Sequence, residues 1–182
     1  MSDCTIGFSA KLNGKLGFIS AAHCPNSVSY WGATSASGSA LGTATKYSTS
    51  NRKFADISFY QLSTNTPVPY FWGTSNAELM RADTVQSAYV GQRLCHRGQT
   101  SGFSCGTVES ITYTPTWDST AYVNQSCSNT FISVYGGSSL SGDSGGPWFS
   151  GRHPVGIHKA GGASSLVLSK LSYSPATVMV QP

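Results

Sequence analysis

The chain has 182 residues, of which 39% are hydrophobic and only 10% are charged, and its formal net charge at pH 7 is +4. This length allows one large or two small domains, and the Lys and Arg residues form no basic run of the kind that binds nucleic acid. No apolar stretch approaches the roughly 20 residues of a membrane-spanning helix, so neither a nucleic-acid nor a membrane partner is expected.

The first third of the chain predicts short strands separated by turns. Asn13-Gly14 is a strong two-residue hairpin signal between strands at residues 5–8 and 16–19. Further strands are predicted at residues 28–31, 41–44 and 57–62. Together these strands are sufficient for a small closed barrel.

A connector is predicted at residues 63–73, which contain Pro67 and Pro69. Ser75 and Glu78 have the spacing of a capping box, which favours either one short helix through Arg81 or a loop containing a turn.

A second set of strands follows the connector. They are predicted at residues 88–90, 107–113, 121–123, 131–134, 147–149, 154–158 and 166–168. The pattern indicates an all-β protein with two barrels or sandwiches, and we place the boundary between residues 1–72 and 73–182.

The most informative motif is Gly142-Asp143-Ser144-Gly145-Gly146-Pro147. Its glycines allow tight turns and close approach to Ser144, which are the conditions a nucleophilic hydroxyl needs. The N–H groups of Gly142 and Ser144 are candidates for an oxyanion hole. A Gly-Asp-Ser-Gly string is also an ordinary surface turn, so the motif requires a histidine and a carboxylate elsewhere.

Both partners are present upstream. His23 ends the segment Ser20-Ala21-Ala22-His23, and Asp56 lies in Ala55-Asp56-Ile57. The order His23, Asp56, Ser144 is one of the orders in which a catalytic triad occurs. The three motifs together resemble the chymotrypsin-like serine proteases, and most closely the bacterial streptogrisin and α-lytic branch, from Cys4 to the last strand.

The resemblance implies two six-stranded antiparallel β-barrels with the active site in the cleft between them. It also implies a secreted, monomeric serine endopeptidase that forms an acyl-enzyme on Ser144, acts on polypeptides and needs no cofactor.

Cysteine placement agrees with this resemblance. The pairs Cys4–Cys24 and Cys95–Cys105 match cystine positions of the branch, and two disulfides imply an oxidising compartment. The second pair flanks residues 96–102, whose composition predicts a turn-rich segment. We therefore expect a mature domain whose leader and any pro-region are absent from this chain, the alternative being an intracellular protein. Cys127 is left over and is expected to be a free, buried thiol.

Two departures from the branch concern the surroundings of Ser144. The branch pairs the buried aspartate before the nucleophile, here Asp143, with an arginine just after the first cysteine of the second disulfide. His96 occupies that position, and Arg97, one residue later, is the candidate partner. The branch also usually has a cystine that joins the segment before Gly142 to the loop after Ile157 and braces the pocket. That cystine is missing here, because the segment before Gly142 carries Leu140 and no cysteine follows Cys127.

The substrate pocket is predicted from residues on both sides of the nucleophile. The candidates are Ser138, Ser139, Ser141, His158, Ala160 and Gly161. The Gly-Ile-His string at residues 156–158 resembles glutamate-specific enzymes of the family and viral relatives that cut after Gln. An imidazole and several hydroxyls supply hydrogen-bond donors, so cleavage after Glu or Gln is expected. Lys159 would add positive potential while pointing away from His158.

Several alternatives remain open on the sequence. His158 could merely pack beneath a pocket for apolar residues, as in broad-specificity relatives. The chain could be a processing protease of viral type, or a non-catalytic binding module that keeps the protease fold. His153 and His158 have no Cys or carboxylate near them in the sequence, so no metal is expected.

Overall fold

The protein is an all-β molecule, as predicted. The computed structural model describes residues 4–31, 40–50, 55–73, 78–115, 129–161 and 165–181. Its strands are β1 (Ser9–Leu12), β2 (Lys15–Ser20), β3 (Ser27–Tyr30), β4 (Gly42–Thr49), β5 (Ser58–Leu62), β6 (Tyr70–Trp72), β7 (Leu79–Arg81), β8 (Arg93–Gly98), β9 (Gly102–Tyr113), β10 (Phe131–Tyr135), β11 (Pro147–Ser150), β12 (His153–Gly161), β13 (Ser165–Lys170) and β14 (Thr177–Val178). A single 3₁₀ turn, η1, spans Leu171–Tyr173, and within the described ranges no helix could cross a membrane.

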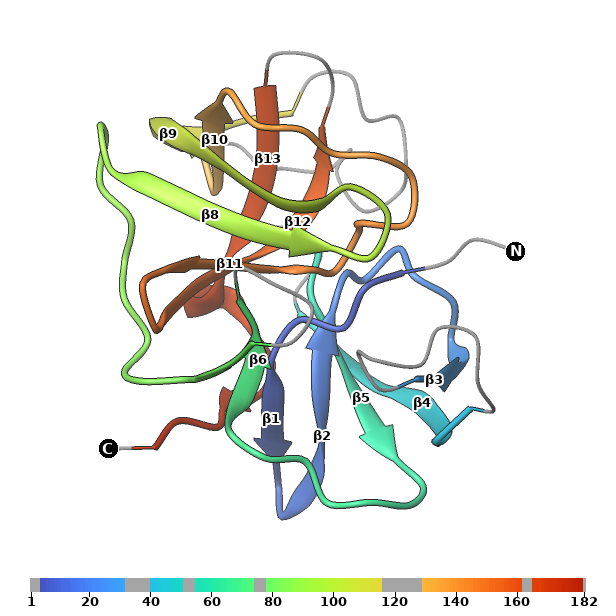
Figure 1. The fold of residues 1–182 in the computed structure, drawn as a ribbon. Coiled ribbons are helices and arrows are strands. Elements are labelled where there is room, and N and C mark those ends of the chain that lie inside the picture. Colours follow the sequence, from blue (N-terminus) through green and yellow to red (C-terminus); the bar gives the residue numbers. More distant parts are fainter. Residues whose placement is uncertain are drawn as a thin grey trace.

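Strands β1 to β5 and the C-terminal strand β14 form a six-stranded sheet in the order β14-β1-β2-β5-β4-β3. This sheet is the first half of the molecule and occupies the lower part of Figure 1. The predicted hairpin joins β1 to β2, with Asn13 and Gly14 at φ values of 49° and 80°. Positive φ at both positions is what a two-residue hairpin turn requires. Strand β2 therefore runs up the middle of the sheet beside β5 and ends next to the second half of the molecule.

The second half is a closed six-stranded barrel in the order β10-β13-β12-β11-β8-β9, the upper part of Figure 1. Alternate side chains of its strands fill the interior. The buried interior residues are Leu94, Val108, Ile132, Val134, Trp148, Val155, Leu166 and Leu168. A closed barrel has no free sheet edge, so each of its six strands pairs with a neighbour on both sides.

An aromatic cluster joins the sheet to the barrel. Phe71 of β6 packs against Phe8, with ring centroids 5.2 Å apart, and against Phe149 of β11 at 4.9 Å. These rings belong to one buried cluster that also includes Ile157 of β12. The two halves therefore share a core, which fixes the side chains that meet between them.

Three local predictions differ from the structure. Residues 79–81, expected in a short helix or a loop, form β7 and pair with β6, where Tyr70 lies opposite Arg81. Residues 88–90 are not a strand, because the strand begins later, at Arg93. The segment around Cys95 was expected to be turn-rich, but β8 and β9 pair there with Cys95 opposite Cys105.

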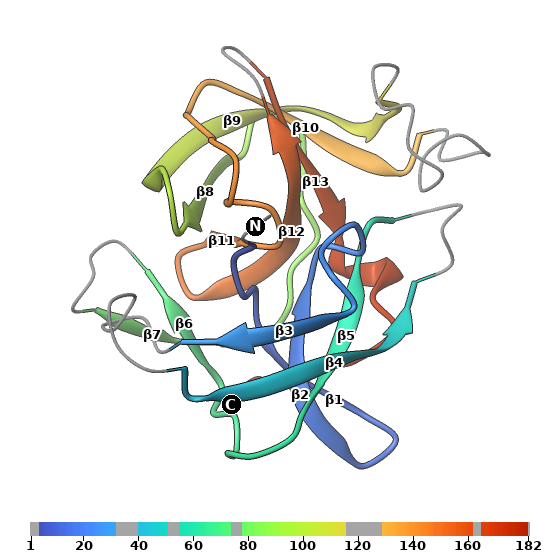
Figure 2. The ribbon, with the colours of Figure 1, turned by 90° about the vertical axis from the view of Figure 1, so that its right-hand side faces the viewer.

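The division of the chain into domains between residues 72 and 73 stays a prediction. Two strand pairs join residues on opposite sides of this boundary. Strand β14 returns from the barrel side to pair with β1, with Val178 opposite Ala10, and β6 pairs with β7 across the boundary. The turned view in Figure 2 shows β3 and β4 nearest the viewer, running across in front of β2. The expected strand at residues 121–123 and the thiol of Cys127 lie outside the described residues.

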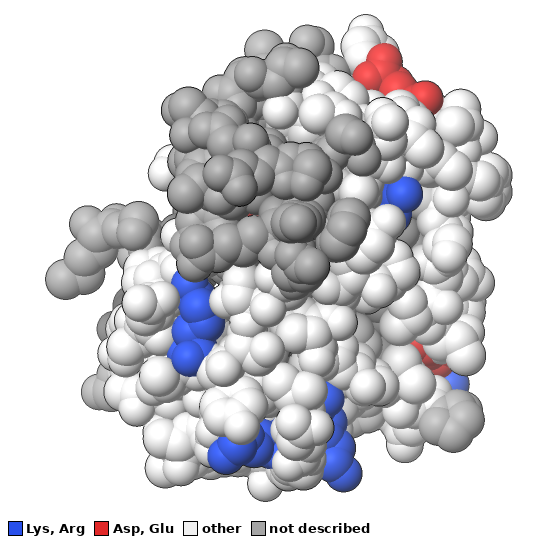
Figure 3. All heavy atoms as spheres, turned by 180° about the vertical axis from the view of Figure 1, so that it is seen from behind, with Lys and Arg blue, Asp and Glu red and all other residues white. Residues whose placement is uncertain are grey.

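The face seen in Figure 3 carries few charges. Lys and Arg side chains lie there in small separate groups with uncharged surface between them. This distribution agrees with a sequence in which only 10% of residues are charged.

Candidate active site

His23 and Asp56 come together because their strands are neighbours. Strand β2 ends at Ser20, which lies opposite Ser58 of β5, so the turn after β2 and the residues before β5 meet at the same end of the sheet. His23 Nδ1 lies 2.6 Å from Asp56 Oδ2, and the His23 backbone N–H donates to Asp56 Oδ1 over 2.9 Å. Two contacts to one carboxylate fix both the position and the orientation of the imidazole.

The turn that carries His23 is braced from two sides. The predicted disulfide Cys4–Cys24 is present immediately after the histidine. On the other side, Lys46 Nζ of β4 donates to the carbonyl oxygens of Ala22 and Cys24 over 2.8 and 2.7 Å. The second predicted disulfide, between Cys95 and Cys105, joins β8 to β9 in the barrel.

Asp56 is buried, with 1% of its surface exposed. Burial alone would raise the pKa of Asp56. The hydrogen bonds and positive charges of His23 and Lys159 outweigh this effect and lower the pKa to about 2. Lys159 Nζ lies 3.2 Å from Asp56 Oδ2, and the Asp56 backbone N–H donates to Ser169 Oγ over 3.0 Å. The carboxylate is therefore ionised in the folded protein at neutral pH.

Ser144 is presented by the glycine-rich turn before β11. A Cβ atom added to Gly145 would lie 1.9 Å from Ser20 Oγ, so only glycine permits this turn to pack so closely on the end of β2. The Thr5 backbone N–H donates to the Ser144 carbonyl oxygen over 2.8 Å. These contacts bring Ser144 to the turn that carries His23.

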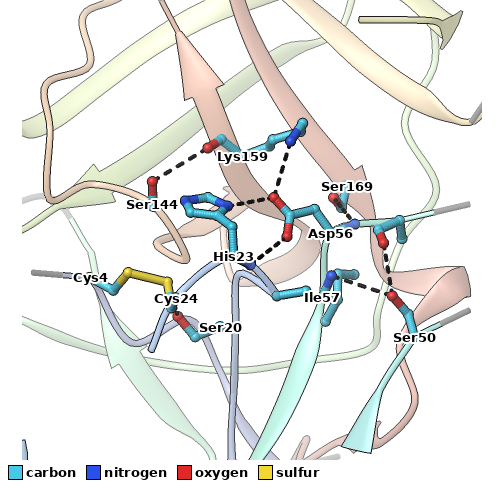
Figure 4. A network of polar contacts seen from close by, with 12 residues as sticks. Cys4, Ser20, His23, Cys24, Ser50, Asp56, Ile57, Ser144, Lys159 and Ser169 are labelled. Atoms are coloured by element: carbon cyan, nitrogen blue, oxygen red, sulfur yellow. Dashed lines mark hydrogen bonds and ion pairs between the residues drawn. A yellow bond between two sulfur atoms is a disulfide. The ribbon is translucent and has the colours of Figure 1, made fainter. Parts of the chain in front are cut away.

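Ser144, His23 and Asp56 lie in this order across the site. Figure 4 shows the imidazole of His23 between Ser144 and Asp56. Ser144 Oγ donates over 3.4 Å to the carbonyl oxygen of Lys159 in this unliganded state. Hydrogen bonds between nucleophile and base are often loose without substrate and shorten when it binds.

The two predicted oxyanion donors lie in the same turn. Gly142 has a φ of 104°, a conformation that L side chains rarely adopt. Among the hydrogen bonds of the described residues, none uses the backbone N–H of Gly142 or Ser144 as donor. This is the condition required of groups that stabilise a transient oxyanion.

Asp143 is held by backbone N–H groups. Its Oδ1 accepts from Thr100 and Ser101 over 2.9 and 3.1 Å, and its Oδ2 accepts from Leu140 over 2.8 Å. Burial raises the pKa of Asp143, but the hydrogen bonds from Ser101, Leu140 and Thr100 lower it overall. The turn between β8 and β9 therefore stabilises this carboxylate.

Arg97, the expected partner of Asp143, lies on the other face of β8. A Cβ added to the adjacent Gly98 would lie 2.1 Å from the Asp143 carboxyl group, so Gly98 faces Asp143 and, because side chains alternate, Arg97 points away. Arg97 Nη1 approaches the carbonyl oxygen of Gly73 at 3.5 Å. The expected arginine–aspartate pairing is corrected to a set of N–H donors.

The predicted pocket residues Ser139 and His158 are in contact. Ser139 Oγ lies 2.7 Å from His158 Nε2, and Trp148 Nε1 donates to His158 Nδ1 over 3.1 Å. His158 is 1% exposed, and its pKa is lowered to about 3, chiefly by burial. The imidazole is therefore neutral, and because an indole N–H can only donate, its proton is on Nε2, towards Ser139.

The other predicted pocket residues surround this pair. A Cβ on Gly161 would lie 3.3 Å from Ser139 Cβ, so the two segments that were expected to form the pocket walls approach each other here. The carbonyl oxygens of Ser138 and Ser141 accept hydrogen bonds from His96 and Thr100, and Ala160 is half-buried next to Gly161.

Sequence reasoning missed two residues of this region. His96 is fully buried and stacks on His158 and Trp148, with ring centroids 5.0 and 4.6 Å apart. Lys159 points onto Asp56 and so belongs to the triad's surroundings. The pairing of Cys95 with Cys105 could have revealed β8, and alternation along β8 would then have placed His96 inside the barrel.

No metal site is formed by the described residues, where no three His, Cys, Asp or Glu side chains gather. His153, considered as a ligand, lies at the surface, where its Nδ1 is 2.9 Å from the carbonyl oxygen of Thr84. His158 is already bonded through both nitrogens to Ser139 and Trp148.

Known proteins match this chain over nearly all its length. The family profile described as Trypsin matches residues 9–174. Streptogrisin-A of Streptomyces griseus is 25% identical over 97% of the chain, which spans 54% of that protein. Glutamyl endopeptidase 2 of the same species is also 25% identical over 97% of the chain, and the match covers 88% of that protein. Among solved structures, Thermobifida fusca Protease A superposes with a TM-score of 0.77 at 22% identity, covering 98% of this chain and 92% of that one.

The contacts of Asp143 predict that Asp143→Ala weakens both the fold and the site. The change leaves the N–H groups of Thr100, Ser101 and Leu140 without their acceptor, at up to about 1–3 kcal/mol each where water does not replace it. We expect a loss of about 3 kcal/mol in the free energy of unfolding. Because the pKa of Asp143 is lowered in the fold, the difference should be full above the ordinary pKa of an aspartate and should shrink as the pH falls from there through the lowered pKa of Asp143.

Urea denaturation measured from neutral to acidic pH checks this expectation. Asp83→Ala is the matched control, because Asp83 is a carboxylate near the surface paired with Arg81 and Arg152. The assignment is wrong if Asp143→Ala costs no more than Asp83→Ala at neutral pH.

Proposed function

Because this chain belongs to the trypsin family, we propose that it is a serine endopeptidase that hydrolyses polypeptides through an acyl-enzyme on Ser144. The observation that carries this proposal is the placement of the His23 imidazole. The buried carboxylate of Asp56 holds its Nδ1, and the ring lies between Asp56 and Ser144. A base fixed in this way leaves Nε2 available to take a proton from a neighbouring hydroxyl.

In the proposed reaction, Ser144 Oγ attacks the substrate carbonyl carbon while His23 Nε2 removes the hydroxyl proton. The negative charge that develops on the carbonyl oxygen is stabilised by the N–H groups of Gly142 and Ser144. His23 returns its proton to the departing amine, which leaves the acyl group on Ser144. Water then attacks the acyl carbon while His23 Nε2 removes its proton; the bond to Ser144 Oγ breaks, His23 returns the proton to that oxygen, and the acid is released.

Asp56 supports each proton transfer without moving a proton itself. With its pKa held at about 2, the carboxylate stays charged and stabilises the imidazolium that forms in each transition state. Its bond to Nδ1 also keeps the imidazole in the tautomer that presents Nε2 to Ser144.

A serine-directed phosphonate should label Ser144 and abolish peptide hydrolysis. His23→Ala and Ser144→Ala should each lower kcat by a factor on the order of 10⁴ or more, because nucleophile and base act as a unit. Mass spectrometry of the labelled peptide and peptide hydrolysis assays check both expectations. An active preparation in which Ser144 stays unmodified would contradict the mechanism, and a folded protein with neither labelling nor activity would favour a binding module.

For the cleavage preference, we propose that the protease cuts after Glu or Gln. His158 and Ser139 supply donors in the expected pocket, and none of the predicted pocket residues is an aspartate that would attract Lys or Arg. The similarity to a glutamyl endopeptidase supports the same reading. An amide or carboxyl oxygen reaching this pair would gain hydrogen bonds that an apolar side chain cannot make.

The neutral state of His158 bears on the choice between Glu and Gln. Trp148 donates to Nδ1, so a second proton cannot be held there without losing that bond. Burial and the neighbouring His96 also oppose a charge and lower the pKa of His158 to about 3. The pocket therefore offers neutral donors, which suit the amide of Gln or the protonated carboxyl of Glu better than a carboxylate.

This reasoning predicts the outcome of a matched peptide series. Measured kcat/KM should be highest with Gln or Glu before the scissile bond, ahead of Phe, Leu, Ala and Arg. The value for Glu should fall relative to Gln as the pH rises from 5 to 8, because the substrate carboxyl ionises while His158 stays neutral.

His158→Ala should erase the lead of Gln and Glu while sparing the small apolar substrates. The surface residue His153 provides the matched control, and His153→Ala should leave the order of substrates unchanged. A lead for Phe or Leu in the unaltered protein would contradict the pocket assignment.

We further propose that the protein is secreted. Two disulfides stabilise the described chain, and disulfides persist in oxidising compartments. Fractionation of the natural producer should find the intact disulfide-bonded protein in the medium. Recovery of the reduced protein from the cytoplasm would contradict this localisation.

A further inference from the structure

Strand β12 places a lysine against the carboxylate that orients His23. Lys159 is 3% exposed, and its Nζ lies 3.2 Å from Asp56 Oδ2. Burying an ammonium group is costly unless the charge is paired. The lysine is thus fixed in the site by its ion pair.

The strand geometry explains how the lysine reaches this position. Side chains alternate along β12, so His158 faces the expected pocket while Lys159 faces the opposite side, where Asp56 lies. The register of β12 against β13 shifts between His158 and Ala160. Lys159 is also the residue whose carbonyl oxygen receives the hydrogen bond from Ser144 Oγ, so one residue contacts both ends of the triad (Figure 4).

A single oxygen of Asp56 serves two donors. Oδ2 lies 2.6 Å from His23 Nδ1 and 3.2 Å from Lys159 Nζ. When His23 takes a proton during catalysis, the new positive charge faces a carboxylate whose charge is already balanced by a fixed cation. An aspartate without such a neighbour attracts the imidazolium more strongly.

The remaining neighbours do not cancel this effect. The ring of Phe131 on β10 lies 5.9 Å from Lys159 Nζ, and β13 contributes the uncharged Ser169 hydroxyl. Lys46 on β4 adds a further positive charge beside the turn of His23, and the neutral imidazole of His158 lies on the far face of β12. Among the described residues, the charged and titratable groups that act on Asp56 are thus His23 and Lys159, with Lys46 beside the His23 turn.

We propose that Lys159 is a positioning residue that balances the charge of Asp56, so that His23 stays uncharged and able to accept the Ser144 proton at lower pH than it would beside Asp56 alone. This inference rests on the proposed peptidase function. Lys159 thus sets the acidic limit of activity, and it does so through Asp56 without touching the substrate.

The test is the pH profile of kcat/KM with a peptide that carries Gln before the scissile bond, because this side chain does not ionise. The midpoint of the acid limb, where activity falls as the pH is lowered, is compared between the unaltered protein and its variants. Lys159→Gln and Lys159→Met, which remove the charge and keep an unbranched side chain, should each move this midpoint upward by about one pH unit. Lys159→Arg keeps the charge and should leave the midpoint in place.

Lys11→Gln is the matched control, since Lys11 is an exposed lysine of β1 and its loss removes the same charge away from the site. A merely structural role for Lys159 would lower kcat/KM at all pH values without moving the midpoint. An unmoved midpoint in a folded, charge-removing variant would therefore overturn the inference.

Two charge-removing variants, Lys159→Gln and Lys159→Met, keep the inference testable if one of them fails to fold. An inactive protein in which Ser144 takes no phosphonate label would instead overturn the proposed function, and the role of Lys159 with it.

Discussion

The carboxylate of Asp56 is the interaction on which the rest of this site depends. Its oxygens accept from the backbone and the ring of His23, on the turn after β2. From the barrel side it receives Lys159 of β12, and its backbone N–H is bonded to Ser169 of β13. One buried residue thus fixes the base and ties the six-stranded sheet to the closed barrel. Without its partners, this buried charge would oppose folding.

The position of Ser144 depends on a second constraint, which is the close packing of neighbouring segments against glycine residues. Gly145 lies against Ser20, and Gly98 lies against Asp143, at distances that leave no room for a Cβ atom. The first contact brings the Ser144 turn to the end of β2, and the second lets β8 cover the aspartate that precedes Ser144. The motif around Ser144 is therefore a packing requirement as much as a chemical one.

The sequence predicted the parts of this arrangement that are encoded in local patterns. The Asn13-Gly14 hairpin, most of the strands and the two disulfides follow from turn chemistry, alternation and resemblance to relatives. The sequence did not reveal contacts that depend on which face of a strand meets which neighbour. The direction of Arg97, the burial of His96 and the contact between Lys159 and Asp56 are all of this kind. Such contacts depend on the register between paired strands, which the pattern of a single segment does not specify. Strand β8 itself was not predicted, because the composition of its residues favours turns.

The pairing of β14 with β1 has a consequence for the timing of synthesis. Strand β1 receives its second neighbour only when Thr177 and Val178 have been made, and the Thr5 backbone reaches its partner at Ser144 only after the nucleophile turn exists. Chains emerge from the ribosome from the N-terminus, at about 5–20 residues per second. The first sheet must therefore wait, incomplete, while the barrel is translated. The turns that carry His23 and Ser144 therefore cannot meet until both halves of the described chain have been made, so this site assembles late in the synthesis of the part of the chain described here.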